Sequence, residues 1–160
     1  MRGQTLPDSV ETESPRRPLW PVGIVALSVA GLLVSGYLAS LKYGGSLKLC
    51  EGLGGCDVVN ASQYSWVGGT GGLPVAVLGL GGYAVLLLLS LWAWRAADDM
   101  PSWLPLGIFG ISLIGVLYSA YLTYLELFVI YAVCPWCVAS AVIIAVIFVL
   151  SVRGVTTAAG

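Results

Sequence analysis

The sequence predicts an all-α membrane protein: a four-transmembrane-helix bundle with an extracytoplasmic loop that bears a short helix. Hydrophobic residues make up 58% of the 160 residues and charged residues only 9%, which is too little polar surface for a water-facing domain. Four apolar stretches are each long enough to cross a hydrocarbon core of about 30 Å. Histidine is absent from the sequence, so the commonest metal ligand and general base is missing and four cysteines are the main reactive groups.

The polar N-terminal segment 1–18 is rich in proline and acidic residues, so we expect a disordered cytoplasmic tail. The first span follows at about 20–41, where no charge interrupts the apolar run. This run exceeds the hydrophobic region of a usual signal peptide and no convincing cleavage site follows it, so we expect it to remain in the protein. The four-helix transmembrane redox domain is expected to cover 19–153, and 154–160 to form a second cytoplasmic tail.

A polar, glycine-rich segment at 42–72 is the predicted redox loop. The remaining spans are expected at about 73–94, 103–125 and 127–152. Pro74 falls in the first turn of the second span, where a missing backbone donor does little harm. Glu126 interrupts the apolar sequence between the last two spans. We interpret it as a tight reversal on the extracytoplasmic side.

Basic residues beside the spans predict the orientation. One side carries Arg16, Arg17, Arg95 and Arg153, and the other carries Lys42 and Lys48. The larger set belongs in the cytoplasm, so both termini are predicted to be cytoplasmic and the long loop extracytoplasmic. The net charge of −1, without a basic cluster, gives no sign of nucleic-acid binding.

Polar groups are scarce inside the spans themselves. Carboxylates, lysines and arginines are absent from their interiors, which disfavours a proton pump or an ion-coupled transporter. Gly79, Gly81 and Gly82 lie in the second span. Helix contact is the favoured interpretation of these glycines, and room for a flat ligand is the alternative.

The motif Cys134-Pro135-Trp136-Cys137 is the most specific signal in the sequence. Cysteines three residues apart on a helix share one face, and proline between them disfavours helical geometry at Cys134, so the helix is expected to start or kink there. A redox pair is the favoured interpretation, with two structural thiols or half a metal site as alternatives. Cys134 follows Glu126 by eight residues, about 12 Å of helix, which predicts a site within the outer leaflet that suits a lipid-soluble acceptor such as a quinone.

A second cysteine pair, Cys50 and Cys56, lies in the long loop with a glycine-rich spacer between its members. Asp57 is a plausible cap for a short helix over 58–64, which would favour a thiolate at Cys56. We interpret this pair as redox-active, and a permanent structural disulfide is the alternative. The loop is long enough for the outer pair to reach the inner pair and exchange disulfides with it.

Several motifs, in this order, resemble the vitamin K epoxide reductase family in its bacterial four-helix form without a fused thioredoxin domain. They are Cys56-Asp57-Val58-Val59, Ser62 with Tyr64, Gly72-Leu73-Pro74 followed by Gly79, and Cys134-Pro135-Trp136-Cys137. The resemblance covers roughly residues 20–152. It implies a membrane thiol:quinone oxidoreductase of the bacterial inner membrane. Ala141 stands where the animal enzymes carry tyrosine, which favours plain quinone reduction over epoxide reduction.

The resemblance also implies a role for each cysteine. Cys137 would face and reduce the quinone, which is menaquinone or ubiquinone, and Cys134 would receive electrons from the loop. Cys56 would exchange with Cys134, while Cys50 would exchange with an extracytoplasmic DsbA-like thioredoxin-fold protein. Ser62 matches a family serine near the active site, and an ordinary polar loop residue is the alternative.

Two other functions remain open at this point. A DsbB-type oxidoreductase performs the same net reaction, but its close-spaced cysteine pair precedes the wide pair, the reverse of the order here. A membrane carrier for mercury or copper would also use paired thiolates. Adjacent cysteines and methionine-rich segments are both absent from the sequence, which disfavours the carrier.

Overall fold

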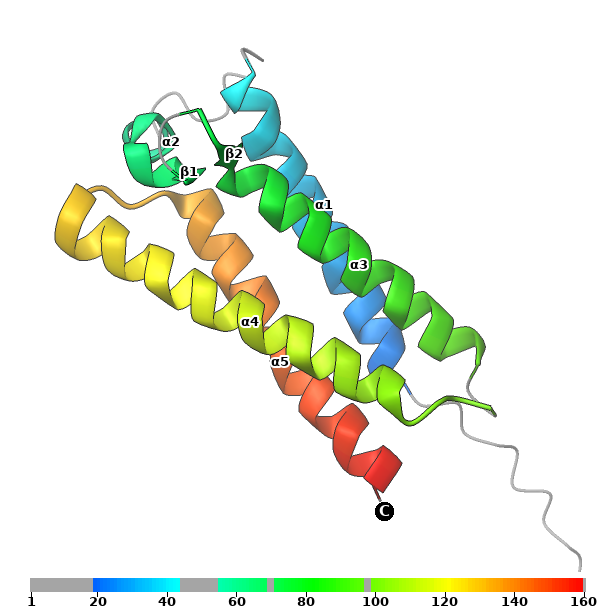
Figure 1. Cartoon of the computed structure of the whole chain (residues 1–160). Helices are drawn as coiled ribbons and strands as arrows, with labels where there is room; N and C mark the ends of the chain where they lie inside the picture. Colours follow the sequence, from blue (N-terminus) through cyan, green and yellow to red (C-terminus); the bar gives the residue numbers. More distant parts are fainter. Residues whose placement is uncertain (1–18, 44–54, 69–70, 97–98, 160) are drawn as a thin grey trace, which may run out of the picture.

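A computed structural model describes residues 19–43, 55–68, 71–96 and 99–159 (Figure 1). Its four long helices are α1 (Trp20–Lys42), α3 (Val75–Arg95), α4 (Trp103–Leu125) and α5 (Pro135–Ala159). Each of them belongs to a segment that is long and apolar enough to cross a membrane. The described part of the chain therefore confirms the predicted fold class, a helical membrane protein with four candidate spans.

Short elements gather at one end of the bundle (Figure 1). They are α2 (Cys56–Ala61), the 3₁₀ turn η2 (Gln63–Ser65), and the two-residue strands β1 (Trp66–Val67) and β2 (Leu73–Pro74). The strands pair antiparallel, with Trp66 opposite Pro74. Pro74 is the N-cap of α3 rather than a residue of its first turn. The start of α1, the end of α5 and the connection between α3 and α4 lie at the opposite end (Figure 1).

The helices pack unevenly around the bundle. Helix α1 packs along α3 and α5, and α4 packs along α5, whereas α3 and α4 meet over much less of their length. The tightest core lies toward the end that holds the start of α1, where Ile24, Leu104, Ile108 and Ile147 are fully buried. The half of the bundle nearest the short elements is therefore the half in which α3 and α4 can enclose a cavity.

Many large apolar side chains face outward, among them Leu33, Leu88, Ile114 and Val149, which are each more than half exposed. Exposed apolar surface on this scale is unfavourable in water and favourable in lipid. The outer surface of the bundle is thus that of a membrane protein.

The connection between α4 and α5 differs from the sequence-based expectation. Helix α4 continues into a π-helical turn, η3 (Glu126–Ile130), which ends at Tyr131 in the left-handed region with φ of 54°. The backbone N–H groups of Tyr131 and Ala132 both donate to the Glu126 carbonyl and close the turn. Glu126 is therefore not an exposed reversal: its side chain is only 4% exposed.

The fourth long helix starts at Pro135 and not near residue 127. Proline suits the first turn of a helix because its missing N–H has no partner there, and it disfavours helical geometry in the residue before it. Cys134 consequently lies at the N-terminus of a helix, and not about 12 Å along a helix that starts near Glu126. The expectation of a helix start at this motif is confirmed, and the expectation of a helical path from Glu126 to Cys134 is wrong.

Candidate functional site

Cys134 caps the N-terminus of α5. Its carbonyl accepts the N–H of Val138 at 3.1 Å, which is the first hydrogen bond of the helix, and its Sγ accepts the N–H of Cys137 at 3.4 Å. A side-chain acceptor at the N-cap satisfies an otherwise orphaned helix donor. The sulfur that caps the helix is thus held at the positive end of its macrodipole.

The same arrangement favours the thiolate of Cys134. The Cys137 thiol donates a hydrogen bond to the Cys134 sulfur, and this bond, helped by the Cys137 backbone N–H and a contact with Cys56, outweighs burial and lowers the pKa of Cys134 from 9.0 to about 6. Thiolates are the attacking species in disulfide exchange, and low-pKa thiols are good leaving groups. Cys134 can therefore serve both as the attacking thiolate and as the leaving thiolate of an exchange reaction at neutral pH.

Cys56 meets Cys134 across the top of the bundle. It is the first residue of α2, it is 2% exposed, and its Sγ lies 3.6 Å from the Sγ of Cys134. The two sulfurs are covered by partly buried hydrophobic side chains, which include Tyr37, Leu41 and Trp136. The sulfur contact is thus shielded from water by side chains of α1 and α5.

Gly55 permits this close approach. A Cβ atom at this position would lie 2.6 Å from the Ala132 Cβ and 3.1 Å from the Val133 backbone nitrogen. The first distance is too short for two carbon atoms and the second is tight, so a side chain here would push α2 away from the segment that leads into Cys134. The glycine before Cys56 therefore sets the distance between the two cysteines.

Glu126 is a component of the site that the sequence did not reveal. Its Oε2 accepts the backbone N–H of Cys134 at 3.1 Å. The Cys137 thiol, which has a single hydrogen, can donate it to this carboxyl group instead of to the Cys134 sulfur. In the sequence this residue resembles a boundary charge at the end of an apolar run. Only the fold of the π-helical turn brings its carboxyl group to the cysteines.

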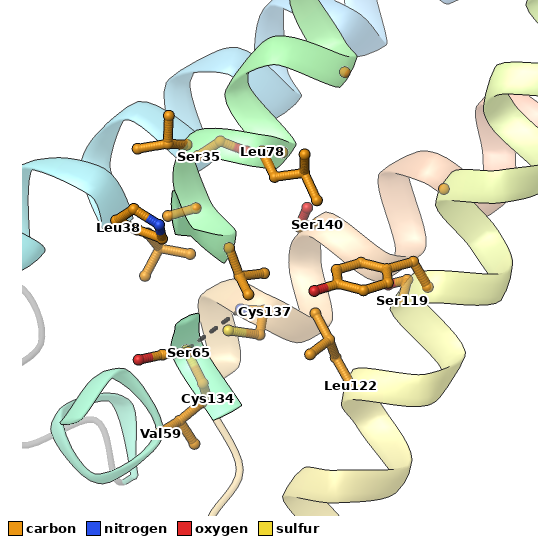
Figure 2. A pocket seen from close by; sticks show the side chains of 18 of the residues that line it. Ser35, Leu38, Val59, Ser65, Leu78, Ser119, Leu122, Cys134, Cys137 and Ser140 are labelled. Atoms are coloured by element: carbon orange, nitrogen blue, oxygen red, sulfur yellow. Dashed lines mark hydrogen bonds between the residues drawn. The ribbon is translucent and has the colours of Figure 1, made fainter. Parts of the chain in front are cut away.

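A cavity of about 610 Å³ extends from the cysteines into the bundle between α3 and α4. Figure 2 shows its lining from four helices: Ser35 and Leu38 from α1, Leu78 from α3, Ser119 and Leu122 from α4, and Ser140 from α5, with Cys134 and Cys137 at one side. Gly81 and Gly82 also line it, and a Cβ at either would meet no atom within 4 Å. For these two glycines the structure favours room for a ligand. Gly79 instead packs against α1, because a Cβ there would lie 3.2 Å from the Ser35 Oγ, which favours helix contact.

The described residues contain three of the four predicted cysteines and bring them together. Cys50 lies outside the described residues. Ser62 lines the cavity, and its Oγ donates to the Val59 carbonyl at 2.7 Å. Asp57 is not the predicted helix cap, because α2 begins one residue earlier, at Cys56, with Gly55 in the N-cap position. Within the described part of the chain, no group of three or more His, Cys, Asp or Glu side chains is arranged so that it could hold a metal ion.

Comparison with protein-family sequence models matches residues 22–152 to the Vitamin K epoxide reductase family. This match covers most of the chain and includes every residue of the site described above. No curated protein matches the sequence.

Proposed function

The chain belongs to the vitamin K epoxide reductase family, whose members are membrane thiol–disulfide oxidoreductases, and from this premise we propose that it passes electrons from external thiols to a membrane quinone. Quinones are the electron acceptors generally used in this family. The observation that carries the proposal is the contact between Cys56 and Cys134, which joins the loop to the start of α5 at 3.6 Å.

In the first step, a Cys50–Cys56 disulfide accepts two electrons from the dithiol of a DsbA-like thioredoxin-fold protein, which becomes a disulfide. The Cys56 thiolate then attacks Sγ of Cys134 in a Cys134–Cys137 disulfide and forms a mixed disulfide, with Cys137 as the leaving thiolate. Cys50 attacks Cys56 and restores the outer disulfide, which leaves Cys134 and Cys137 reduced. Each exchange breaks one S–S bond and forms one, so electrons and bonds balance.

In the second step, the reduced pair transfers two electrons to the quinone, and the two sulfurs form a disulfide again. The cavity supports this step in three ways. Its volume of about 610 Å³ falls within the range of small-molecule sites, its lining is mainly apolar, and Cys137 lies on its wall. The quinone supplies the two-electron acceptor, while the residues of the cavity bind and orient its ring beside Cys137. Ser62 also lines the cavity and stays a candidate contact.

The proposed location is the bacterial inner membrane, with both termini in the cytoplasm. This orientation follows from the larger number of arginines at the end of the bundle where α1 starts and α5 ends. It puts the cysteines on the extracytoplasmic side, where folding proteins receive disulfides. The physiological role is then to support disulfide bond formation by reoxidising the thioredoxin-fold partner.

One experiment separates this function from the metal carrier. Purified, reduced protein in detergent is mixed with either a soluble quinone analogue or a soft metal ion, and quinone absorbance and free thiols are followed. The proposal predicts that two thiols disappear for each quinone reduced, and that Cys137→Ser abolishes the reaction. Stoichiometric metal uptake with an unreacted quinone would overturn it in favour of the carrier.

A further inference from the structure

Glu126 is a buried carboxyl group that has no part in the electron relay as proposed. It is 4% exposed, and an ionised carboxylate buried away from water is unfavourable unless its charge is compensated. Both of its side-chain partners belong to the inner cysteine pair: the backbone N–H of Cys134 at 3.1 Å, and the thiol of Cys137. The carboxyl group is thus hydrogen-bonded to the backbone of Cys134 and lies beside the Cys137 thiol.

None of the described residues that line the cavity beside this carboxyl group is basic. The other titratable groups around the cavity are Cys56 from α2, Tyr64 from η2, Tyr83 from α3, Tyr118 from α4, and Cys134 and Cys137 at the start of α5; α1 contributes only Ser35 and Leu38. None of these can supply a positive charge. A proton is therefore the compensating charge that the site itself offers to Glu126.

The polypeptide also holds this carboxyl group in place. The Glu126 carbonyl accepts the N–H groups of both Tyr131 and Ala132, and Tyr131 takes a left-handed conformation to close the turn. A non-glycine residue in that region is uncommon and costs free energy. The turn fixes the segment that leads from Glu126 to Cys134, and with it the hydrogen bond between the Glu126 carboxyl group and the Cys134 N–H.

The geometry assigns to Glu126 the role of proton carrier for the Cys134–Cys137 pair during quinone reduction, an inference that rests on the proposed function. Its carboxylic acid gives a proton to an oxygen of the quinone, and the carboxylate that remains takes the thiol proton of Cys137 as that sulfur joins Cys134. Cys134 enters as a thiolate, so the second proton comes from water on the loop side. One thiolate, one thiol, one proton and one quinone become a disulfide and a quinol, and Glu126 ends as it began.

Glu126→Gln is the sharpest test because the amide oxygen can still accept the Cys134 N–H, while the side chain can no longer take a proton. General acid–base groups contribute roughly 100-fold or more to rate, so quinone reduction by the pre-reduced variant should slow by about that factor. Glu126→Asp keeps a carboxyl group and should recover part of the rate. Asp99→Asn removes an exposed carboxyl group in the connection between α3 and α4, which lies at the opposite end of the bundle, and should leave the rate unchanged.

A second readout needs no quinone. The infrared difference spectrum between protein oxidised chemically and protein reduced with a phosphine should contain a carboxylic-acid C=O band. This band should vanish in Glu126→Gln and persist in Asp99→Asn. The band arises because the C=O frequency of protonated Glu126 changes when the neighbouring dithiol becomes a disulfide, and a Glu126 side chain that is ionised in both states would not produce it. Correct folding of the variant is checked independently by linking Cys56 to Cys134.

The outcomes separate this inference from the proposed function. A wild-type protein that leaves quinone unreduced overturns the proposed function, and the infrared band still decides whether Glu126 holds a proton beside the cysteine pair. A folded Glu126→Gln variant that reduces quinone at the wild-type rate overturns the proton-carrier role. Absence of the carboxyl band from the wild-type spectrum overturns it as well.

Discussion

The sulfur atoms of Cys56 and Cys134 lie 3.6 Å apart, although 78 positions separate the two residues in the sequence. A disulfide bond is about 2.05 Å long, so a shift of less than 2 Å would join them. Helix α2 presents one sulfur and the N-terminus of α5 presents the other. In the proposed relay, this contact is the point at which electrons pass between the loop and the bundle.

Gly55→Ala should separate these two sulfurs, because the new Cβ would collide with Ala132 and the Val133 backbone. We expect quinone reduction driven by a dithiol protein donor to fall at least tenfold, which corresponds to about 1.4 kcal/mol in the barrier. Reduction driven by a small phosphine, which acts directly on the inner disulfide, should change little. Gly110→Ala, where the added Cβ meets no atom within 4 Å, is the matched control. Equal losses with both reductants would contradict a role in spacing.

The reactivity of Cys134 should depend on pH in a way that ordinary cysteines do not. Because its pKa is lowered to about 6, the thiolate is present above pH 6 and is lost as the pH falls through that value. Alkylation of Cys134 in the reduced protein, followed by peptide mass spectrometry, should therefore reach a plateau above about pH 7.

Cys137→Ala tests the cause of this shift, because it removes the thiol hydrogen bond that contributes most to the lowered pKa. The midpoint of Cys134 alkylation should move to higher pH in this variant. A wild-type alkylation rate that continues to rise to pH 9 would contradict the assignment.

Filling the cavity should weaken quinone binding more than it weakens disulfide exchange. Gly82 lines the cavity, and a Cβ atom there would meet no other atom within 4 Å. The leucine side chain of Gly82→Leu would therefore extend into open space. We expect KM for the quinone to rise several-fold, while the exchange between Cys56 and Cys134 is preserved. Gly110→Leu is the same substitution at a glycine that does not line the cavity, and it should leave KM unchanged. A matching rise in both variants would point to a general packing defect.

The main architecture and the meeting of the loop cysteine with the inner pair could be predicted from the sequence. Apolar runs of sufficient length require helices in a bilayer, where every backbone group must be satisfied internally. The Cys134-Pro135-Trp136-Cys137 motif predicts a helix start because proline imposes it locally. Features that depend on chain length and local geometry were therefore accessible.

Features that depend on packing between distant segments were not accessible. Glu126 ends an apolar run, and a charge in that position is interpreted as a surface turn, whereas the π-helical turn buries it against the cysteines. Gly55 gives no sign that Ala132 will lie against it. The cavity arises because α3 and α4 diverge near the loop. A hydropathy profile identifies the apolar helices but does not say which of them contact one another.

The most direct measurement is a disulfide-trapping experiment in the double variant Cys50→Ser/Cys137→Ser. This protein retains Cys56 and Cys134 without the residues that would resolve a bond between them. The proposed relay predicts that mild oxidation in membranes links the peptides of Cys56 and Cys134 in high yield, as detected by non-reducing mass spectrometry, and that adding Cys56→Ser abolishes the link. Two unlinked thiols that remain fully reactive toward an alkylating reagent would contradict it.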